Sequence, residues 1–78
     1  QVLFSIPYYL TYEQLTVRAD TNGIEDLSDL SGKAVGTLKS TVAERILVAE
    51  KNIIVKGYDH ESSAYGDLIN GRIDAVLL

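Results

Sequence analysis

The stretch AVGTLKSTVAERILVAE, residues 34–50, decides the fold of this chain. Residues 34–38 are mostly apolar or β-branched, which predicts a β-strand. Residues 41–50 predict a helix, because apolar side chains recur on one helical face at Val42, Ile46 and Ala49. Only two residues separate these elements, so the strand runs almost directly into the helix.

The alternation of strand and helix continues toward the C-terminus. The β-branched run at 53–55 predicts a strand that is covered on both faces. Residues 62–70 predict a second helix that Gly71 ends, and residues 73–78 predict the last strand. Such alternation implies an α/β fold with a parallel sheet and right-handed crossovers.

Toward the N-terminus the sequence predicts two strands and a short helical stretch. Residues 2–5 predict a strand that ends at Pro7, since proline cannot donate to a strand ladder. Residues 15–19 alternate apolar and other side chains, as in a half-exposed strand. Residues 24–30 carry an apolar residue every three positions, which is typical of one helical edge. Gly32 follows where a left-handed cap is expected.

The composition limits the class of protein. A chain of 78 residues with 46% hydrophobic residues is at most one globular domain. With 7 basic and 11 acidic residues the net charge is −4, and no segment concentrates the basic ones. This argues against nucleic acid and against an anionic membrane surface, because both attract a basic face. The absence of cysteine excludes disulfides and thiolate catalysis.

The two ends of the sequence predict that it belongs to something longer. The chain begins at Gln1 without a methionine, and it ends within the apolar run 75–78. We therefore expect a domain that is truncated after Leu78. No apolar run approaches the roughly 20 residues of a membrane span.

The loop between the strand at 34–38 and the following helix is the main candidate for chemistry. Ligands of parallel α/β sheets lie beyond the carboxyl ends of the strands, and a helix start presents free N–H groups to an anion. Ser40 and Thr41 add hydroxyl donors, and Lys39 adds a positive charge. The same residues also fit a capping box, since Thr41 is followed three residues later by Glu44. Both interpretations stay open, although the Glu44 charge would compete with a ligand.

Other candidate motifs are weaker. The glycine spacing fits neither a P-loop nor a dinucleotide fingerprint. His60, the single histidine, predicts a solvated loop before the second helix rather than a metal ligand or a base. The acidic residues Glu25, Asp26 and Asp29 lack the pattern of a calcium loop. We expect no catalytic set, no metal and no cofactor, and hence a protein that is not an enzyme.

Four stretches together resemble the family of extracytoplasmic amino-acid-binding proteins of ABC importers, a type II periplasmic-binding-protein fold. They are FSIPYY at 4–9, LSDLSGKAVG at 27–36, KSTVAE at 39–44 and LINGRIDAVL at 68–77. The resemblance implies one lobe of a two-lobe fold, built in three layers around a mainly parallel sheet with helices on both faces. Residues 1–19 would be hinge and crossing strands, and residues 20–78 an incomplete second lobe.

The resemblance also implies a ligand site. In the family, residues at the positions of Ser40 and Thr41 bind the ligand's α-carboxylate through N–H and hydroxyl groups. Leu38, Lys39 and Val42 would lie in the loop that approaches the ligand. Ser40 stands where the family usually has glycine, which leaves the loop conformation open.

The expected function is binding of a small amino acid outside the cytoplasm for uptake through ABC permease subunits. The alternative is a sensor domain of a receptor kinase or glutamate-receptor-like protein; an enzyme on the same scaffold is a weaker one. We also expect a strand-exchanged homodimer of this chain, because Leu3, Phe4, Leu15 and Val17 would lack cover without the first lobe.

Overall fold

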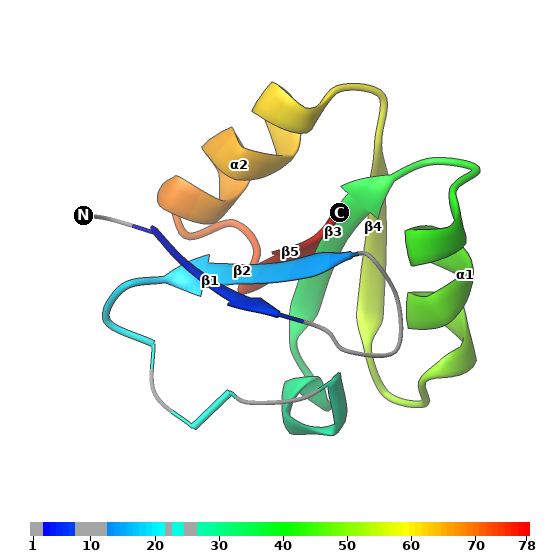
Figure 1. Cartoon of the computed structure of the whole chain (residues 1–78), viewed down its shortest axis with the longest axis horizontal. Coiled ribbons are helices and arrows are strands. Elements are labelled where there is room, and N and C mark those ends of the chain that lie inside the picture. Colours follow the sequence, from blue (N-terminus) through cyan, green and yellow to red (C-terminus); the bar gives the residue numbers. More distant parts are fainter. Residues whose placement is uncertain (1–2, 8–12, 22, 25–26) are drawn as a thin grey trace.

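The computed structural model describes residues 3–7, 13–21, 23–24 and 27–78 (Figure 1). Its strands are β1 (Leu3–Pro7), β2 (Gln14–Arg18), β3 (Ala34–Leu38), β4 (Ile54–Tyr58) and β5 (Ala75–Leu77). Its helices are the 3-10 turn η1 (Leu27–Leu30), α1 (Val42–Ala49) and α2 (Glu61–Ile69). None of these helices has the length and apolar character needed to cross a membrane.

The described strands form one sheet in the order β1-β2-β5-β3-β4. β3 pairs in parallel with both β4 and β5, whereas β2 is antiparallel to β5 and to β1. The last strand is therefore inserted between β2 and β3 (Figure 1). The predicted strand–helix–strand units from residue 34 onward are confirmed, and so is the mainly parallel direction, because β2 alone opposes the other four strands.

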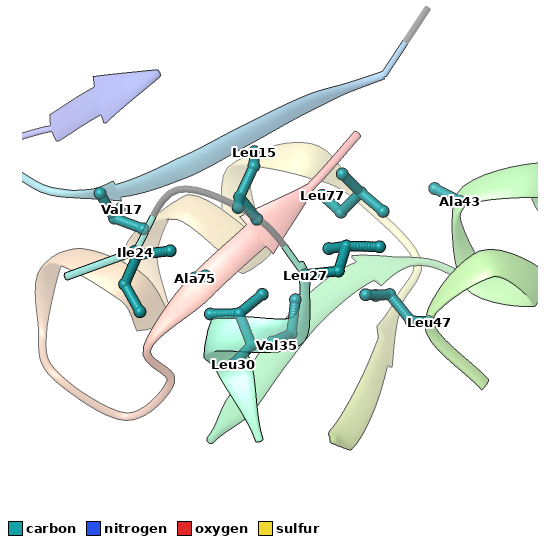
Figure 2. Packing of buried hydrophobic residues seen from close by; sticks show 10 residues of the cluster. All are labelled: Leu15, Val17, Ile24, Leu27, Leu30, Val35, Ala43, Leu47, Ala75 and Leu77. Atoms are coloured by element: carbon teal, nitrogen blue, oxygen red, sulfur yellow. The ribbon is translucent and has the colours of Figure 1, made fainter. Parts of the chain in front are cut away.

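Helices cover both faces of the sheet, as expected for three layers. Neighbouring residues of β5 point to opposite faces: Ala75 and Leu77 pack with α1, and Val76 packs with α2. On the α1 side, Ala43 and Leu47 of the helix join η1 and the inner strands in the larger core cluster (Figure 2). That cluster consists of Leu15, Val17, Ile24, Leu27, Leu30, Val35, Ala43, Leu47, Ala75 and Leu77.

The expected exposure of β2 is wrong. Leu15 and Val17 are each only 2% exposed, because β2 lies inside the sheet and turns them into the larger core cluster (Figure 2). Leu3 packs partly against the α2 side. Of the four side chains expected to lack cover, Phe4 alone is largely exposed, at 59%.

The expected cover of the run at 53–55 is also wrong. β4 is an edge strand, paired only with β3 in the described sheet. Ile53 and Val55 pack partly against the α1-side cluster, but Ile54 faces the other way and is 55% exposed. An unbroken β-branched run therefore does not mean two covered faces here.

A group of hydrogen bonds anchors Asp74 and the segment before the last strand. Asp74 brackets Ala34: its N–H donates to the Ala34 carbonyl at 2.7 Å, and its Oδ2 accepts from the Ala34 N–H at 2.9 Å. Arg18 Nη1 donates to the carbonyls of Leu68 at 2.9 Å and Ile73 at 2.7 Å. These contacts tie β2, the end of α2 and the start of β3 together.

Candidate functional site

The candidate site lies where β3 ends and α1 begins, at the carboxyl edge of the parallel strands. Leu38 is the last residue of β3, and Val42 is the first of α1. The Lys39 N–H donates to the Tyr58 carbonyl at 3.0 Å, which continues the pairing of β3 with β4 by one residue. The structure thus brings Leu38, Lys39, Ser40, Thr41 and Val42 into one short loop and first helical turn.

Ser40 adopts a left-handed backbone conformation, with φ of 60°. Residues other than glycine pay a steric cost in this region. The loop therefore takes the conformation that glycine would favour, although serine occupies the position. Its N–H donates to Glu44 Oε1 at 2.9 Å, and this bond stabilises the turn.

Thr41 is the N-cap of α1, so the capping interpretation is confirmed. Its backbone is extended, and its Oγ1 accepts from the Glu44 N–H at 3.2 Å. The same hydroxyl donates to the Leu38 carbonyl at 2.7 Å. A hydroxyl has only one hydrogen to donate. A ligand carboxylate would have to replace the Leu38 oxygen as the acceptor of that hydrogen.

Main-chain donors remain at the helix start. The N–H groups of Thr41, Val42 and Ala43 have no acceptor within the described part of the chain. Val42 itself is 52% exposed, so solvent reaches this end of the helix. Unpaired N–H groups and the partial positive charge of an eight-residue helix together favour an anion.

Two charged side chains modify the electrostatic field at the start of α1. Glu44 places a carboxylate beside the first turn, where it satisfies the Ser40 N–H. Lys39 Nζ lies 3.5 Å from Asp59 Oδ1, with side chains that are 58% and 74% exposed. An exposed pair of this kind is weak, so the Lys39 ammonium stays available to a nearby anion.

The sequence did not reveal the partners of this loop in β4 and directly after it. Asp59 pairs with Lys39, and Gly57 lies beneath the Lys39 stem and the Glu44 carboxylate. The signal that could find them is the parallel register, which places Thr37 beside Gly57 and Leu38 beside Tyr58. A single sequence does not reveal that register before the strand order is known.

The weaker candidate residues belong to no metal-binding group in the described part of the chain. His60 is the N-cap of α2, and its side chain makes no capping hydrogen bond. Asp29 lies in η1, whereas Glu25 and Asp26 are outside the described residues. Within the described ranges, no group of three or more His, Cys, Asp or Glu side chains could hold a metal ion.

The chain is similar to amino-acid-binding proteins in sequence. No protein-family model matches it. It is 36% identical to the L-cystine-binding protein TcyJ of Escherichia coli K12 and 32% identical to ABC transporter arginine-binding protein 1 of the same strain, each over 77 residues. These matches cover 96% and 97% of this chain. The chain spans only 29% and 31% of those two proteins' length.

Solved structures agree in fold. Domain 2 from TmArgBP matches with a TM-score of 0.79 and 30% identity, over 85% of this chain and 73% of that domain. The holo form of ArgBP from T. maritima matches with a TM-score of 0.77 and 28% identity, over 99% of this chain and 35% of that protein. The match to an isolated domain shows that the described fold corresponds to one structural unit of such proteins.

Proposed function

This chain belongs to the family of amino-acid-binding proteins of ABC importers, and on that basis we propose that it holds the carboxylate of an amino acid at the start of α1. The observation that carries the proposal is the set of N–H groups at Thr41, Val42 and Ala43, which have no acceptor in the described chain. They stand at the carboxyl edge of β3, where α/β sheets bind ligands.

The similar proteins support a carboxylate as the group held. Their names specify cystine, arginine and glutamate, whose side chains differ in charge and size. These ligands share the α-carboxylate and the α-ammonium group. A segment common to such proteins is suited to a common group, and a helix start selects the negative one.

The proposal extends to the whole protein. Residues 1–19 form the hinge and crossing strands, and residues 20–78 form most of the second lobe. The intact receptor works in the periplasm or outside the cell and delivers its ligand to ABC permease subunits. A sensor domain of the same fold would use the same carboxylate contact, so the two functions differ in the partner that the receptor meets.

A titration followed by NMR tests the site in this chain. Sodium acetate, added as the simplest carboxylate, should shift the amide signals of Thr41 and Val42 with millimolar affinity, because one contact cannot offset the freedom lost on association. The start of α2, whose N-cap is His60, is the internal control. Equal shifts at both helix starts, or none at Thr41 and Val42, would contradict a dedicated site.

Substitution of Thr41 tests the ligand role in the intact receptor. Thr41→Ala removes the cap and the hydroxyl, and it should weaken amino-acid binding by about 1–3 kcal/mol, or roughly 5- to 150-fold in Kd. Thr41→Ser keeps the hydroxyl and is the matched control, with affinity near that of the parent. Calorimetry showing equal affinity for the parent and Thr41→Ala would leave Thr41 with its capping role alone.

We also propose the strand-exchanged homodimer that the sequence led us to expect, in which β1 packs against the partner. This strand is an edge of the described sheet, and Phe4 is largely exposed on it. Exposed edges and apolar side chains favour pairing with a second chain. The burial of Leu15 and Val17 within the chain reduces the surface available to such a dimer.

A further inference from the structure

We propose that Gly57 is a positioning residue for the anion site, because its missing side chain leaves room for the two side chains that shape the loop. Gly57 lies in β4 beside Thr37 of β3. It touches no ligand in this proposal and acts through Lys39 and Glu44. The inference deepens the proposed function and rests on it for the importance of the loop.

The side chains of Lys39 and Glu44 occupy the space that a side chain at position 57 would need. A Cβ atom at this position would lie 2.8 Å from Lys39 Cγ, 3.7 Å from Lys39 Cε and 3.1 Å from Glu44 Oε2. Glu44 uses its other oxygen, Oε1, to accept from the Ser40 N–H at 2.9 Å. The carboxylate that holds Ser40 thus reaches this position over a glycine.

Lys39 is held by the two residues that follow Gly57 in the chain. Its main-chain N–H donates to the Tyr58 carbonyl at 3.0 Å, and its ammonium lies 3.5 Å from Asp59. Its aliphatic stem therefore crosses β4 above Gly57, and its charge is drawn toward Asp59. The N–H groups of Thr41, Val42 and Ala43, which have no acceptor among the described residues, remain the main-chain donors for an anion.

A methyl group at position 57 would disturb this arrangement sterically. Carbon atoms in contact are separated by about 3.5–4.0 Å, so 2.8 Å requires movement. Lys39 Cγ is close to the main chain, so it can move only through another χ1 rotamer or a backbone shift. The Gly57 backbone is outside the left-handed region, so alanine carries no added backbone strain there.

A methyl group at position 57 would affect the anion site by changing the backbone conformation of Ser40. Its left-handed φ of 60° is costly for serine, and the hydrogen bond to Glu44 helps to hold it. If Glu44 is pushed away, Ser40 can relax to a negative φ. That rotation would turn the following N–H groups of Thr41 and Val42 away from a common acceptor.

Gly57→Ala is the decisive variant, and two other glycines provide controls. Gly36→Ala creates an equally close conflict on the opposite face, 2.7 Å from Ile73 Cδ1 and 2.9 Å from Tyr58 Cε1. A Cβ atom at Gly66 would meet no atom of the described chain within 4 Å. The first control tests general loss of packing, and the second tests the exchange of glycine for alanine itself.

The main readout is the backbone of Ser40, measured by NMR in the chain without any ligand. The parent should show the strong NOE between the N–H and Hα protons of Ser40 that a positive φ produces. Gly57→Ala should weaken this NOE, whereas both controls should keep it. In parallel, acetate binding at Thr41 and Val42 should fall about fivefold in Gly57→Ala, as for the loss of one hydrogen bond.

Two outcomes separate this inference from the proposed function. An unchanged Ser40 NOE in Gly57→Ala, or an equal loss in Gly36→Ala, overturns the role of Gly57 whatever acetate does. Absence of acetate shifts in the parent overturns the carboxylate site and leaves the Ser40 measurement valid. If Gly57→Ala does not fold, the double variant Lys39→Ala/Gly57→Ala removes the closest clash. That variant keeps the close approach to Glu44 Oε2, so its Ser40 NOE should be weaker than that of Lys39→Ala alone, and equal NOEs would contradict the proposed contact.

Discussion

Replacing Thr37 with valine should stabilise this chain. Thr37 lies in β3, is 0% exposed, and its Oγ1 has no hydrogen-bond partner among the residues that the structure describes. Valine has nearly the same shape, since it exchanges the hydroxyl for a methyl group. Both residues are β-branched, so the preference for a strand is little changed. The variant therefore isolates the cost of burying one unpaired hydroxyl.

The expected gain follows from two contributions. A buried polar group without a partner costs about 1–3 kcal/mol, and burial of the added methyl group contributes about 0.8 kcal/mol more. Relaxation around the new side chain offsets part of this sum, so we expect a gain of about 1–2 kcal/mol. In a domain of this size each kcal/mol raises the melting temperature by about 4–8 °C.

Urea unfolding followed by circular dichroism measures the effect, and Thr16→Val is the matched control. Thr16 is also buried, at 4% exposed, but its Oγ1 lies 3.3 Å from Ser5 Oγ. Its replacement removes a hydrogen bond and should cost about 0.5–1.5 kcal/mol. Opposite signs for the two variants support the reasoning. Equal destabilisation by both would refute it, because the Thr37 hydroxyl would then have an acceptor in solution.

Three further predictions concern other parts of the chain. Desolvation and a 2.6 Å hydrogen bond to Asp67 raise the pKa of Tyr58 to about 12. The stability from this contact should therefore be complete below about pH 10 and lost as the pH rises toward 12. Tyrosinate absorbance measures the midpoint of the Tyr58 titration, and Asp67→Asn should lower that midpoint. Ser40→Gly should raise the free energy of unfolding by about 1 kcal/mol, because it relieves a left-handed backbone, and urea unfolding without a gain would show that Ser40 carries no strain. Sedimentation equilibrium should detect a homodimer that Phe4→Ser weakens, and a monomer at high micromolar concentration would contradict the β1 interface.

The Asp67 carboxyl responds in the opposite direction. Its hydrogen bonds from Tyr58 and Arg72 lower its pKa. A depressed carboxyl pKa stabilises the fold above the ordinary range of aspartate, and this contribution is lost as the pH falls through the folded value. The contacts between α2 and β4 are therefore strongest between the two titrations, at neutral pH.

Local patterns predicted the elements of this fold but not their neighbours. Helical periodicity located α1 within one residue at each end, and Gly32 and Gly71 have the positive φ angles of caps. The same patterns misplaced the exposure of Ile54 and Val17. A β-branched run can form an edge strand or a central strand of a sheet, so the strand order decides whether its side chains are covered. That order depends on contacts distant in the chain, such as Asp74 with Ala34.

The candidate site shows why its cap could be predicted and its geometry could not. The capping box appears in sequence as Thr41 and Glu44, and the Thr41 hydroxyl forms the predicted contact with the Glu44 N–H. The Glu44 carboxylate accepts from the Ser40 N–H in place of the Thr41 N–H that a capping box predicts. The donors left for a ligand are main-chain N–H groups, which every residue except proline carries. Their direction depends on the backbone of Ser40 and on the space at Gly57. Affinity for a carboxylate should accordingly respond more to residues that set the backbone than to the exposed charge of Lys39.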